Sequence, residues 1–236
     1  MFEENIVEHY DVLLSLFGKN YLLESKFIHE KILEYSKDYK SLVDYGCGTG
    51  NHLLYFSSFY ASLGLDYSEK MISIAIEKVK NAKFVHTSMR NLKIKDRFDI
   101  ALCLFGSITY LENKTSINHT ILNIKNQLNV GGLFIIEPWY THEEIENRIT
   151  QSQYGSYGAI SGCRMYEISM VGNTAQMKDI ILFNNGKKIK SLTAEHFLTI
   201  LSYDEYGKIL SKNGFSVELM ENPITGRKIF FARKVS

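Results

Sequence analysis

The chain has 236 residues, 45% of them hydrophobic and 2 of them prolines, which suits one large domain with a sizeable core and no stiff linker. Its 27 basic and 26 acidic residues nearly balance, which argues against an extended surface for nucleic acid or anionic lipid. It has no signal-peptide pattern, no apolar run near the roughly 20 residues of a membrane span, and three cysteines without metal-ligand spacing. We therefore expect a cytoplasmic protein without a metal site.

Helices and strands are expected to alternate through the first part of the chain. Two N-terminal helices, at 5–17 and 21–36, carry apolar side chains at helical spacing and would form a helical cap over about residues 1–38. Five apolar strands then alternate with helices, which predicts a parallel sheet covered on both faces. The expected strands are SLVDYG (41–46), YASLGLD (60–66), AKFVHTS (82–88), FDIALCLF (98–105) and LFIIEP (133–138), with helices at 51–58, after Ser68 and at 115–129.

The pattern changes after Pro138. A helix is expected at 141–150, followed by antiparallel strands over about 160–202, with the GN and NNG segments as hairpin turns. A helix at 203–213 and two antiparallel strands around a Pro-Ile-Thr-Gly turn follow. These elements predict an α/β fold: a Rossmann-like, seven-stranded mixed sheet with an inserted antiparallel β subdomain, in a single domain over residues 1–236.

Three glycines, Gly46, Gly48 and Gly50, follow the first strand at two-residue spacing. A phosphate-binding P-loop requires Lys-Ser or Lys-Thr after its last glycine, and YGCGTGNH has neither. A dinucleotide loop requires glycine at the position of Asn51, which disfavours nicotinamide and flavin cofactors. A bare strand-to-helix turn is a further interpretation of the glycines.

S-adenosylmethionine is the ligand that the neighbouring residues favour. It has no phosphate, so the loop needs only to surround its methionine tail and ribose, and Asp44 before the glycines suits that arrangement. Asp66 ends the next strand, 20 residues after Gly46, where a carboxylate can accept hydrogen bonds from both ribose hydroxyls. This second carboxylate, together with the alternating strands, favours the cofactor over a bare turn.

The segments DYGCGTG, LGLDYS, RFDIALCLFGSITYL and GGLFIIEPW resemble the successive motifs of class I S-adenosylmethionine-dependent methyltransferases. More narrowly, the chain resembles the N,N-dimethyltransferases of nucleotide-linked amino sugars in desosamine and mycaminose biosynthesis. That resemblance rests on GKNY, CGTGNHL, HTSMR, FGSI, EPWY, EHFLTILSYDEY and GRKIFFA, which run from about residue 10 to 233. It implies an N-methyltransferase of a nucleotide-linked (dTDP-type) deoxy amino sugar, with no nucleic acid or membrane partner, whose inserted strands could carry a homodimer interface.

The cofactor is expected at the carboxyl ends of the strands, where ligands of such sheets bind. Met89 would cover the adenine, and Ser88 stands where many family members have an acidic residue, so adenine recognition would be weaker or use backbone atoms. The resemblance puts Tyr21 near the methionine carboxylate, although its helical face also suits core packing. The expected cofactor-binding residues are Tyr21, Asp44, Gly46, Cys47, Gly48, Gly50, Asp66, Tyr67, Ser88, Met89, Leu104 and Phe105.

Methyl transfer is an in-line displacement at a sulfonium carbon, so the enzyme mainly aligns a neutral amine and excludes water. Family members have a histidine at the position of Tyr110. A phenol, with an ordinary pKa of about 10, is a poor base at neutral pH. We therefore expect Tyr110 to orient the amine, or the amine to arrive as the free base. Tyr10 matches another active-site tyrosine of the family, with core packing as its alternative.

The remaining expected residues concern the acceptor. Trp139 could wall the sugar pocket, attract the sulfonium through its π face, or simply pack at the rim. The resemblance puts Arg227 at the nucleotide diphosphate, where a guanidinium suits phosphate, and a solvated turn residue is the alternative. Ser107, Arg164 and His196 complete the expected substrate-binding residues, and His196 is equally well explained as a structural histidine.

Tyr110 in place of histidine leaves the acceptor open, because it favours an N- or O-methyltransferase of another small molecule as the main alternative. A non-catalytic protein that retains the pocket is disfavoured, because Asp44, the glycines and Asp66 are all present. An RNA methyltransferase would be expected to carry a basic strip or an appended RNA module, and neither is evident. The sequence thus predicts the methyl donor more closely than the acceptor.

Overall fold

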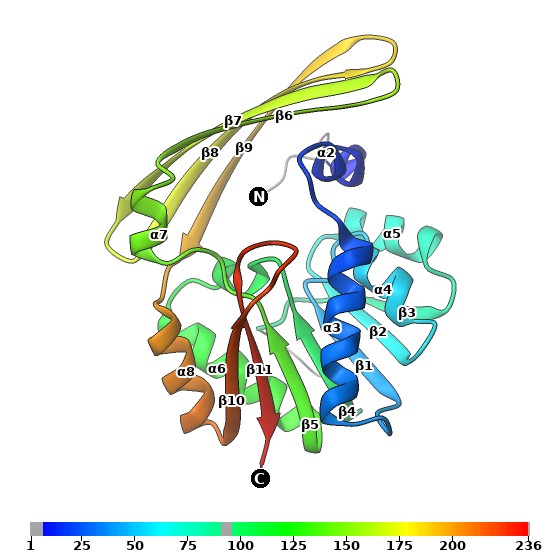
Figure 1. Ribbon diagram of the computed structural model, residues 1–236, viewed down its shortest axis with the longest axis vertical. Helices are drawn as coiled ribbons and strands as arrows, with labels where there is room; N and C mark the ends of the chain where they lie inside the picture. Colours follow the sequence, from blue (N-terminus) through cyan, green and yellow to red (C-terminus); the bar gives the residue numbers. More distant parts are fainter. Residues whose placement is uncertain (1–6, 91–95, 236) are drawn as a thin grey trace. The chain divides into compact units, whose positions relative to one another are not determined.

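The computed structural model describes residues 7–90 and 96–235 (Figure 1). Two compact units are distinguished by their internal contacts. The smaller unit comprises the chain up to Asn20 together with Tyr140–Ile200, and the larger unit comprises Tyr21–Trp139 and the chain from Leu201 onward. The expected single domain over residues 1–236 stays a prediction. No helix within the described ranges is long and apolar enough to cross a membrane.

A seven-stranded mixed sheet forms the larger unit, with the strand order β10-β11-β5-β4-β1-β2-β3. The first five strands are parallel, and β11 is antiparallel to both β5 and β10, so the expected Rossmann-like sheet is confirmed. The strands are β1 (Ser41–Tyr45), β2 (Ala61–Asp66), β3 (Ala82–His86), β4 (Phe98–Cys103), β5 (Leu128–Ile136), β10 (Phe215–Glu221) and β11 (Lys228–Lys234).

Helices cover both faces of this sheet because successive strand residues are apolar on both sides. In β1, for example, Leu42 belongs to one buried cluster and Val43 to the other. Figure 1 shows α3, α4 and α5 on one side of the sheet and α6 and α8 on the other. The helices are α3 (Tyr21–Tyr35), α4 (Asn51–Phe56), α5 (Glu69–Lys78), α6 (Lys114–Gln127) and α8 (Tyr203–Lys212), with a short 3-10 helix η1 (Ser107–Tyr110) after β4.

The boundary between α6 and β5 lies earlier than the sequence pattern predicts. The helix was expected to reach residue 129, but it ends at Gln127 and β5 begins at Leu128. The pairing of β4 with β5 shifts register within the first residues of β5, and Gly131 supplies a positive φ of 80° there. A buried Leu128 fits either the last turn of a helix or the start of a strand, so periodicity alone does not separate the two.

A four-stranded antiparallel sheet, in the order β6-β7-β8-β9, forms the smaller unit. It confirms the expected inserted strands and their two hairpin turns. Strand β6 was not predicted, because its TQSQYGSY segment is mostly polar, and the preceding helix α7 is shorter than the predicted helix at 141–150. The elements of this unit are α2 (Tyr10–Leu16), α7 (His142–Glu146), β6 (Thr150–Tyr157), β7 (Ile160–Val171), β8 (Thr174–Asn185) and β9 (Ile189–Thr199).

The expected N-terminal cap is divided between the two units. Helix α2 belongs to the smaller unit, where Leu13 is buried against Ile181, Phe183 and Leu192. Helix α3 belongs to the larger unit and packs on its sheet. The two helices therefore stabilise different sheets, although they are neighbours in the sequence.

Candidate active site

The glycine loop turns sharply between β1 and α4. Its three glycines have positive φ angles, 80° at Gly46, 54° at Gly48 and 79° at Gly50, which other residues rarely adopt. The N–H of Gly46 donates to the carbonyl of Leu65 at 2.8 Å and ties the loop to β2. A Cβ at Gly46 would lie 2.7 Å from the Cβ of Ser107, whereas a Cβ at Gly48 would meet nothing within 4 Å. The middle of the loop is therefore open to close approach by a ligand.

Two carboxylates lie beside this loop on neighbouring strands. Asp66 accepts hydrogen bonds from the N–H groups of Gly48 and Ser68, both at 2.9 Å, one on each oxygen. Asp44 is 2% exposed, and its Oδ2 has no hydrogen-bond partner in the described part of the chain. A buried carboxylate oxygen without a partner is costly, so this site suits a ligand that brings a donor or a positive charge.

The electrostatics of the two carboxylates point the same way. Burial, and then the charge of Asp66, raise the pKa of Asp44 to about 7. Burial also raises the pKa of Asp66, against the lowering effect of its backbone hydrogen bonds. A cation beside Asp44 would restore its ionised form. The ammonium of a methionine tail meets that requirement, so the residues present fit S-adenosylmethionine.

Cys47 is buried within the same loop. Burial raises the pKa of its thiol well above the ordinary value, and the carboxylates of Asp44 and Asp66 raise it further. The thiol is therefore protonated and unreactive at neutral pH. Cys47 would therefore contribute to a cofactor site through its backbone atoms and not through its thiol.

The segment after β4 makes a second left-handed turn. Phe105 has a φ of 53° and is the one non-glycine residue within 7–90 and 96–235 with a positive φ, and Gly106 follows at 75°. The N–H of Phe105 donates to Glu137 Oε2 at 3.0 Å, and the N–H of Gly106 donates to the backbone carbonyl of Glu137 at 2.9 Å. This turn places Ser107 directly against Gly46 of the glycine loop.

Arg227 is buried between β10 and β11 and pairs with Glu137. Its Nη2 donates to Glu137 Oε2 at 2.5 Å, and its guanidinium lies 4.8 Å from the centre of the Phe105 ring. At 6% exposure, Arg227 is not the solvated turn residue that was one alternative. Its contact with a diphosphate stays a prediction, since the guanidinium already has a carboxylate partner. Glu137 was not among the predicted site residues, although a charged residue ending an apolar strand is a signal for a buried partner.

Tyr21 begins α3 and lies edge-on to His52, with ring centres 5.0 Å apart. His52 follows the glycine loop on α4, and its Nε2 is 3.3 Å from Oε2 of Glu24. Both His52 and Glu24 are buried, so the pair links the start of α3 to the loop. This pair was not predicted from the sequence. The structure places Tyr21 beside the helix that follows the loop, and its contact with the cofactor stays a prediction.

The residues expected near the adenine follow β2 and β3. Met89 reaches the glycine loop, since a Cβ at Gly46 would be 3.6 Å from its Cε. The hydroxyl of Ser88 accepts a hydrogen bond from the N–H of Arg90 at 3.3 Å. Burial and the charge of Asp66 raise the pKa of Tyr67. Leu104, also on the expected list, is buried in the core at the end of β4.

Trp139 and Tyr110 lie beyond the second turn. Trp139 packs against Gly106, where an added Cβ would be 3.2 Å from the Trp139 Cβ. Tyr110 ends η1 and is 38% exposed. Ser107 begins the same short helix, and its hydroxyl donates to the carbonyl of Leu104 at 2.9 Å. Of these residues, Ser107 lies against Gly46 of the glycine loop, and Trp139 lies against the turn that precedes Ser107.

Tyr10, Arg164 and His196 belong to the smaller unit. Arg164 donates to both oxygens of the buried Asp179, at 2.8 and 2.7 Å, and His196 Nε2 lies 3.5 Å from the same carboxylate. Burial would raise the pKa of Asp179, but hydrogen bonds from His196 and Arg164 lower it below the ordinary value. Tyr10 packs against the cluster that contains Leu13. These contacts match the structural alternatives for His196 and Tyr10, and the substrate roles of all three residues stay predictions.

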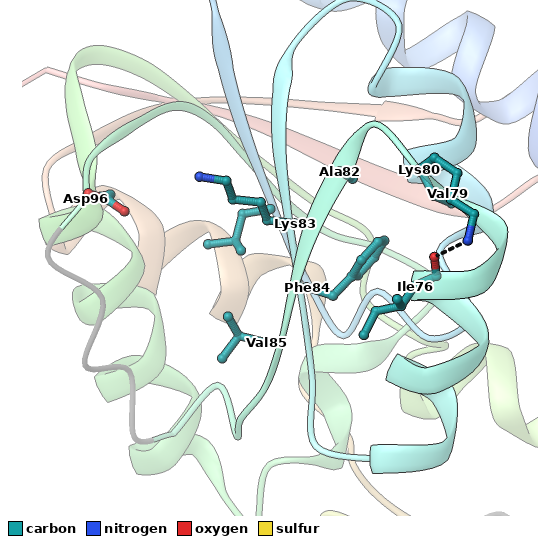
Figure 2. A pocket seen from close by; sticks show the side chains of 9 residues that line it. Ile76, Val79, Lys80, Ala82, Lys83, Phe84, Val85 and Asp96 are labelled. Carbon is teal, nitrogen blue, oxygen red and sulfur yellow. Dashed lines mark hydrogen bonds between the residues drawn. The ribbon is translucent and has the colours of Figure 1, made fainter.

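A cavity of about 670 Å³ lies beside the edge strand β3 (Figure 2). Its lining includes Ile76, Val79, Phe84, Lys80 and Lys83, and the Nζ of Lys80 donates to the carbonyl of Ile76 at 3.2 Å. None of the residues expected to bind the cofactor or the acceptor lines it. The candidate site is therefore assigned from the glycine loop and its carboxylates.

Comparison with known proteins bears on this site. Residues 42–132, which contain the loop and both carboxylates, match the family model of the methyltransferase domain. A dTDP-3-amino-3,4,6-trideoxy-alpha-D-glucopyranose N,N-dimethyltransferase of Streptomyces venezuelae is 25% identical over 98% of this chain and 98% of its own. A dTDP-4-amino-2,3,4,6-tetradeoxy-D-glucose N,N-dimethyltransferase of Saccharopolyspora spinosa is 25% identical over 94% of this chain and 89% of its own.

Two solved structures have the same fold. DesVI of Streptomyces venezuelae has a TM-score of 0.91 at 24% identity, covering 99% of this chain and 100% of its own. SAM-bound CalS10, an amino pentose methyltransferase from Micromonospora echinaspora involved in calicheamicin biosynthesis, has a TM-score of 0.88 at 22% identity, covering 95% and 96%. The likeness extends over nearly the whole of each chain, so it includes both the seven-stranded and the four-stranded sheet.

Proposed function

We propose that this chain is a class I S-adenosylmethionine-dependent methyltransferase and that it methylates the amino group of a nucleotide-linked deoxy amino sugar. The observation that carries the proposal is the nearly full-length match to two relatives named as N,N-dimethyltransferases of dTDP-amino sugars. A match confined to the methyltransferase domain would support only the cofactor. This match also spans the segment that forms β6–β9, which the methyltransferase domain model does not reach.

The proposed cofactor contacts follow from the two carboxylates. Asp44 would hold the methionine ammonium, which provides the missing partner for its Oδ2. Asp66 would accept the ribose hydroxyls, because each of its oxygens accepts one backbone N–H and retains capacity for another donor. The open backbone at Gly48 would admit the ligand close to the loop. When bound, the cofactor supplies a methyl group already activated on its sulfonium.

The acceptor would meet Ser107, Tyr110 and Trp139, which follow the ends of β4 and β5. An amine must be neutral to attack, and a tyrosine hydroxyl is suited to orienting it by a hydrogen bond rather than to removing its proton at neutral pH. We infer that this side of the site aligns the amine and excludes water. The proton lost from nitrogen would then pass to solvent or buffer.

The direct test is to incubate the protein with isotopically labelled S-adenosylmethionine and a panel of dTDP-linked 3-amino and 4-amino deoxysugars. Mass spectrometry is expected to find one or two added methyl groups on at least one sugar. The matched control is Asp66→Asn, which should give at least about fivefold less labelled product at a cofactor concentration near the wild-type Kd. Cofactor binding without methylation of any member would overturn the amino-sugar proposal and leave the methyltransferase assignment intact.

A second candidate is methylation of another small molecule at nitrogen or oxygen. The observation that favours it is Tyr110, at a position where the resembling enzymes have histidine. The same panel should therefore include the corresponding 3-hydroxy and 4-hydroxy sugars and free amino sugars without a nucleotide. Labelling of these alone would favour the second candidate.

We further propose that the chain forms a homodimer through the face of β6–β9 opposite α2. That face exposes the large apolar side chains of Tyr154, Met165, Ile180 and Leu182, and exposed apolar patches often mark interaction surfaces. Ile180→Asp together with Leu182→Asp should lower the sedimentation coefficient to that of a monomer, while the wild type sediments as a dimer. A monomeric wild type at micromolar concentration would contradict the proposal.

A further inference from the structure

Glu137 forms hydrogen bonds to the segment 103–106 through its backbone N–H, its backbone carbonyl and its carboxylate. Its N–H donates to the carbonyl of Cys103 at 3.0 Å, its own carbonyl accepts the N–H of Gly106 at 2.9 Å, and its carboxylate accepts the N–H of Phe105 at 3.0 Å. The residue is 1% exposed. Glu137 therefore holds the chain from the end of β4 through the second left-handed turn.

The carboxylate of Glu137 is paired and hydrogen-bonded by residues of the turn between β10 and β11. Arg227 pairs with Oε2, and Thr225 and Asn222 donate to Oε1 at 3.1 and 3.4 Å. A buried carboxylate is retained only when it is paired and hydrogen-bonded in this way. The turn between β10 and β11 is thereby tied to the turn after β4.

Glu137 and Arg227 contact the backbone and the ring of Phe105, respectively. Its backbone N–H bonds to the carboxylate of Glu137, and its ring lies against the guanidinium of Arg227. A bulky residue keeps a positive φ only when its surroundings impose it. The two charged residues supply those surroundings.

The position of the turn matters because Ser107 comes next. Ser107 lies so close to Gly46 that a single added carbon there would be 2.7 Å from its Cβ and its Oγ. A shift of the turn would move Ser107 relative to the glycine loop. We propose that Glu137, paired with Arg227, is a positioning residue that holds the Phe105–Gly106 turn so that Ser107 supports the cofactor loop.

The test is a double-mutant cycle on cofactor binding by calorimetry, with the variants Glu137→Gln, Phe105→Gly and both together. Glu137→Gln alone should raise the Kd for S-adenosylmethionine about tenfold. In the Phe105→Gly background the same change should cost no more than about threefold, because glycine adopts a positive φ without support. Equal losses in both backgrounds, or no loss in either, would overturn the proposal.

Two further variants keep the test decisive. If Glu137→Gln does not fold, because Arg227 is left unpaired, Glu137→Gln with Arg227→Met takes its place in the cycle. Glu221→Gln, which removes an exposed partner of Lys228 on the same hairpin, should leave the Kd unchanged. The proposal rests on cofactor binding and not on the acceptor. A wild type that fails to bind S-adenosylmethionine would count against the methyltransferase itself, whereas additive losses count only against this role of Glu137.

Discussion

The carboxylate of Asp66 accepts a hydrogen bond from the N–H of Gly48 at 2.9 Å, so the residue expected to bind the ribose also fixes the loop that surrounds the cofactor. Its other oxygen accepts the N–H of Ser68 at the start of α5. Both oxygens therefore serve as acceptors before any ligand binds. An amide at this position would have to turn its NH₂ group toward one of the two N–H donors.

Asp66→Asn should consequently weaken S-adenosylmethionine binding by about 10- to 100-fold, through the loop as well as through lost ribose contacts. Calorimetric titration of the cofactor measures this. Asp204→Asn, which removes an exposed partner of Lys208 on α8, should bind like the wild type. Unchanged affinity in Asp66→Asn would remove Asp66 from the proposed site.

The pKa of Asp44 makes the stability of the cofactor-free protein depend on pH. The unfolded chain releases this proton near the ordinary pKa of about 4, whereas burial and Asp66 raise the pKa in the folded protein to about 7. The folded state therefore binds more protons between these values, so the free energy of unfolding falls as pH rises from about 4 to about 7. Asp44→Asn should flatten this part of the profile in urea unfolding. An identical pH profile in wild type and variant would contradict the raised pKa.

The same group predicts proton release when the cofactor binds. Below pH 7 the cofactor-free protein holds Asp44 protonated, and an ammonium beside it would favour the ionised form. At pH 6, binding should release up to about one proton, measured by calorimetry in buffers of different ionisation enthalpy. The release should disappear in Asp44→Asn. Equal release by both proteins would place the ammonium elsewhere.

Tyr110 can be separated from cofactor binding by its kinetic signature. Tyr110→Phe should lower kcat about tenfold while the Kd for S-adenosylmethionine stays unchanged, because the hydroxyl is proposed to orient only the amine. Tyr110→His should extend activity to lower pH by adding a base with a pKa of about 6.5. The measurement is kcat/KM against pH with the best acceptor from the panel. If Tyr110→Phe changes neither kcat nor KM, the amine is oriented by other groups.

Arg227 and Glu137 should behave as a unit in unfolding experiments. Arg227→Met leaves the buried carboxylate of Glu137 unpaired and should reduce the free energy of unfolding by about 3–5 kcal/mol. Adding Glu137→Gln to that variant should recover part of the loss, since no buried charge is then left alone. Urea unfolding of the single and double variants checks this. Strictly additive losses would show that the ion pair contributes little beyond packing.

The parts of the fold that were predictable from sequence are those governed by local patterns. Apolar strands such as FDIALCLF and the glycine loop indicate the parallel sheet and its ligand edge, because burial on both faces requires continuous apolar residues. Strand β6 was not predicted, because its TQSQYGSY segment has few apolar residues. It is an edge strand that pairs with β7, and this pairing leaves no local pattern in the sequence. The cytoplasmic location inferred from composition stays a prediction.

Part of the candidate site was predictable from the sequence and part was not. The carboxylates Asp44 and Asp66 stand at fixed distances from the glycines, so their place near the loop follows from the strand pattern. Glu137 and Arg227 are 90 residues apart and meet only because β5 and β11 are neighbours in the sheet. No local pattern encodes such a pair, which is why the exposure of Arg227 was left open and Glu137 had no assigned role.

The smaller unit is built from two separate stretches of chain, and this has a consequence for synthesis on the ribosome. Ile181, against which Leu13 packs, is made 168 residues after it. Helix α2 must therefore wait for the sheet on which it packs while most of the larger unit is translated and can already fold. A chain halted after residue 139 would carry the five parallel strands β1–β5 of the larger sheet, together with helix α2 but without the four-stranded sheet on which α2 packs.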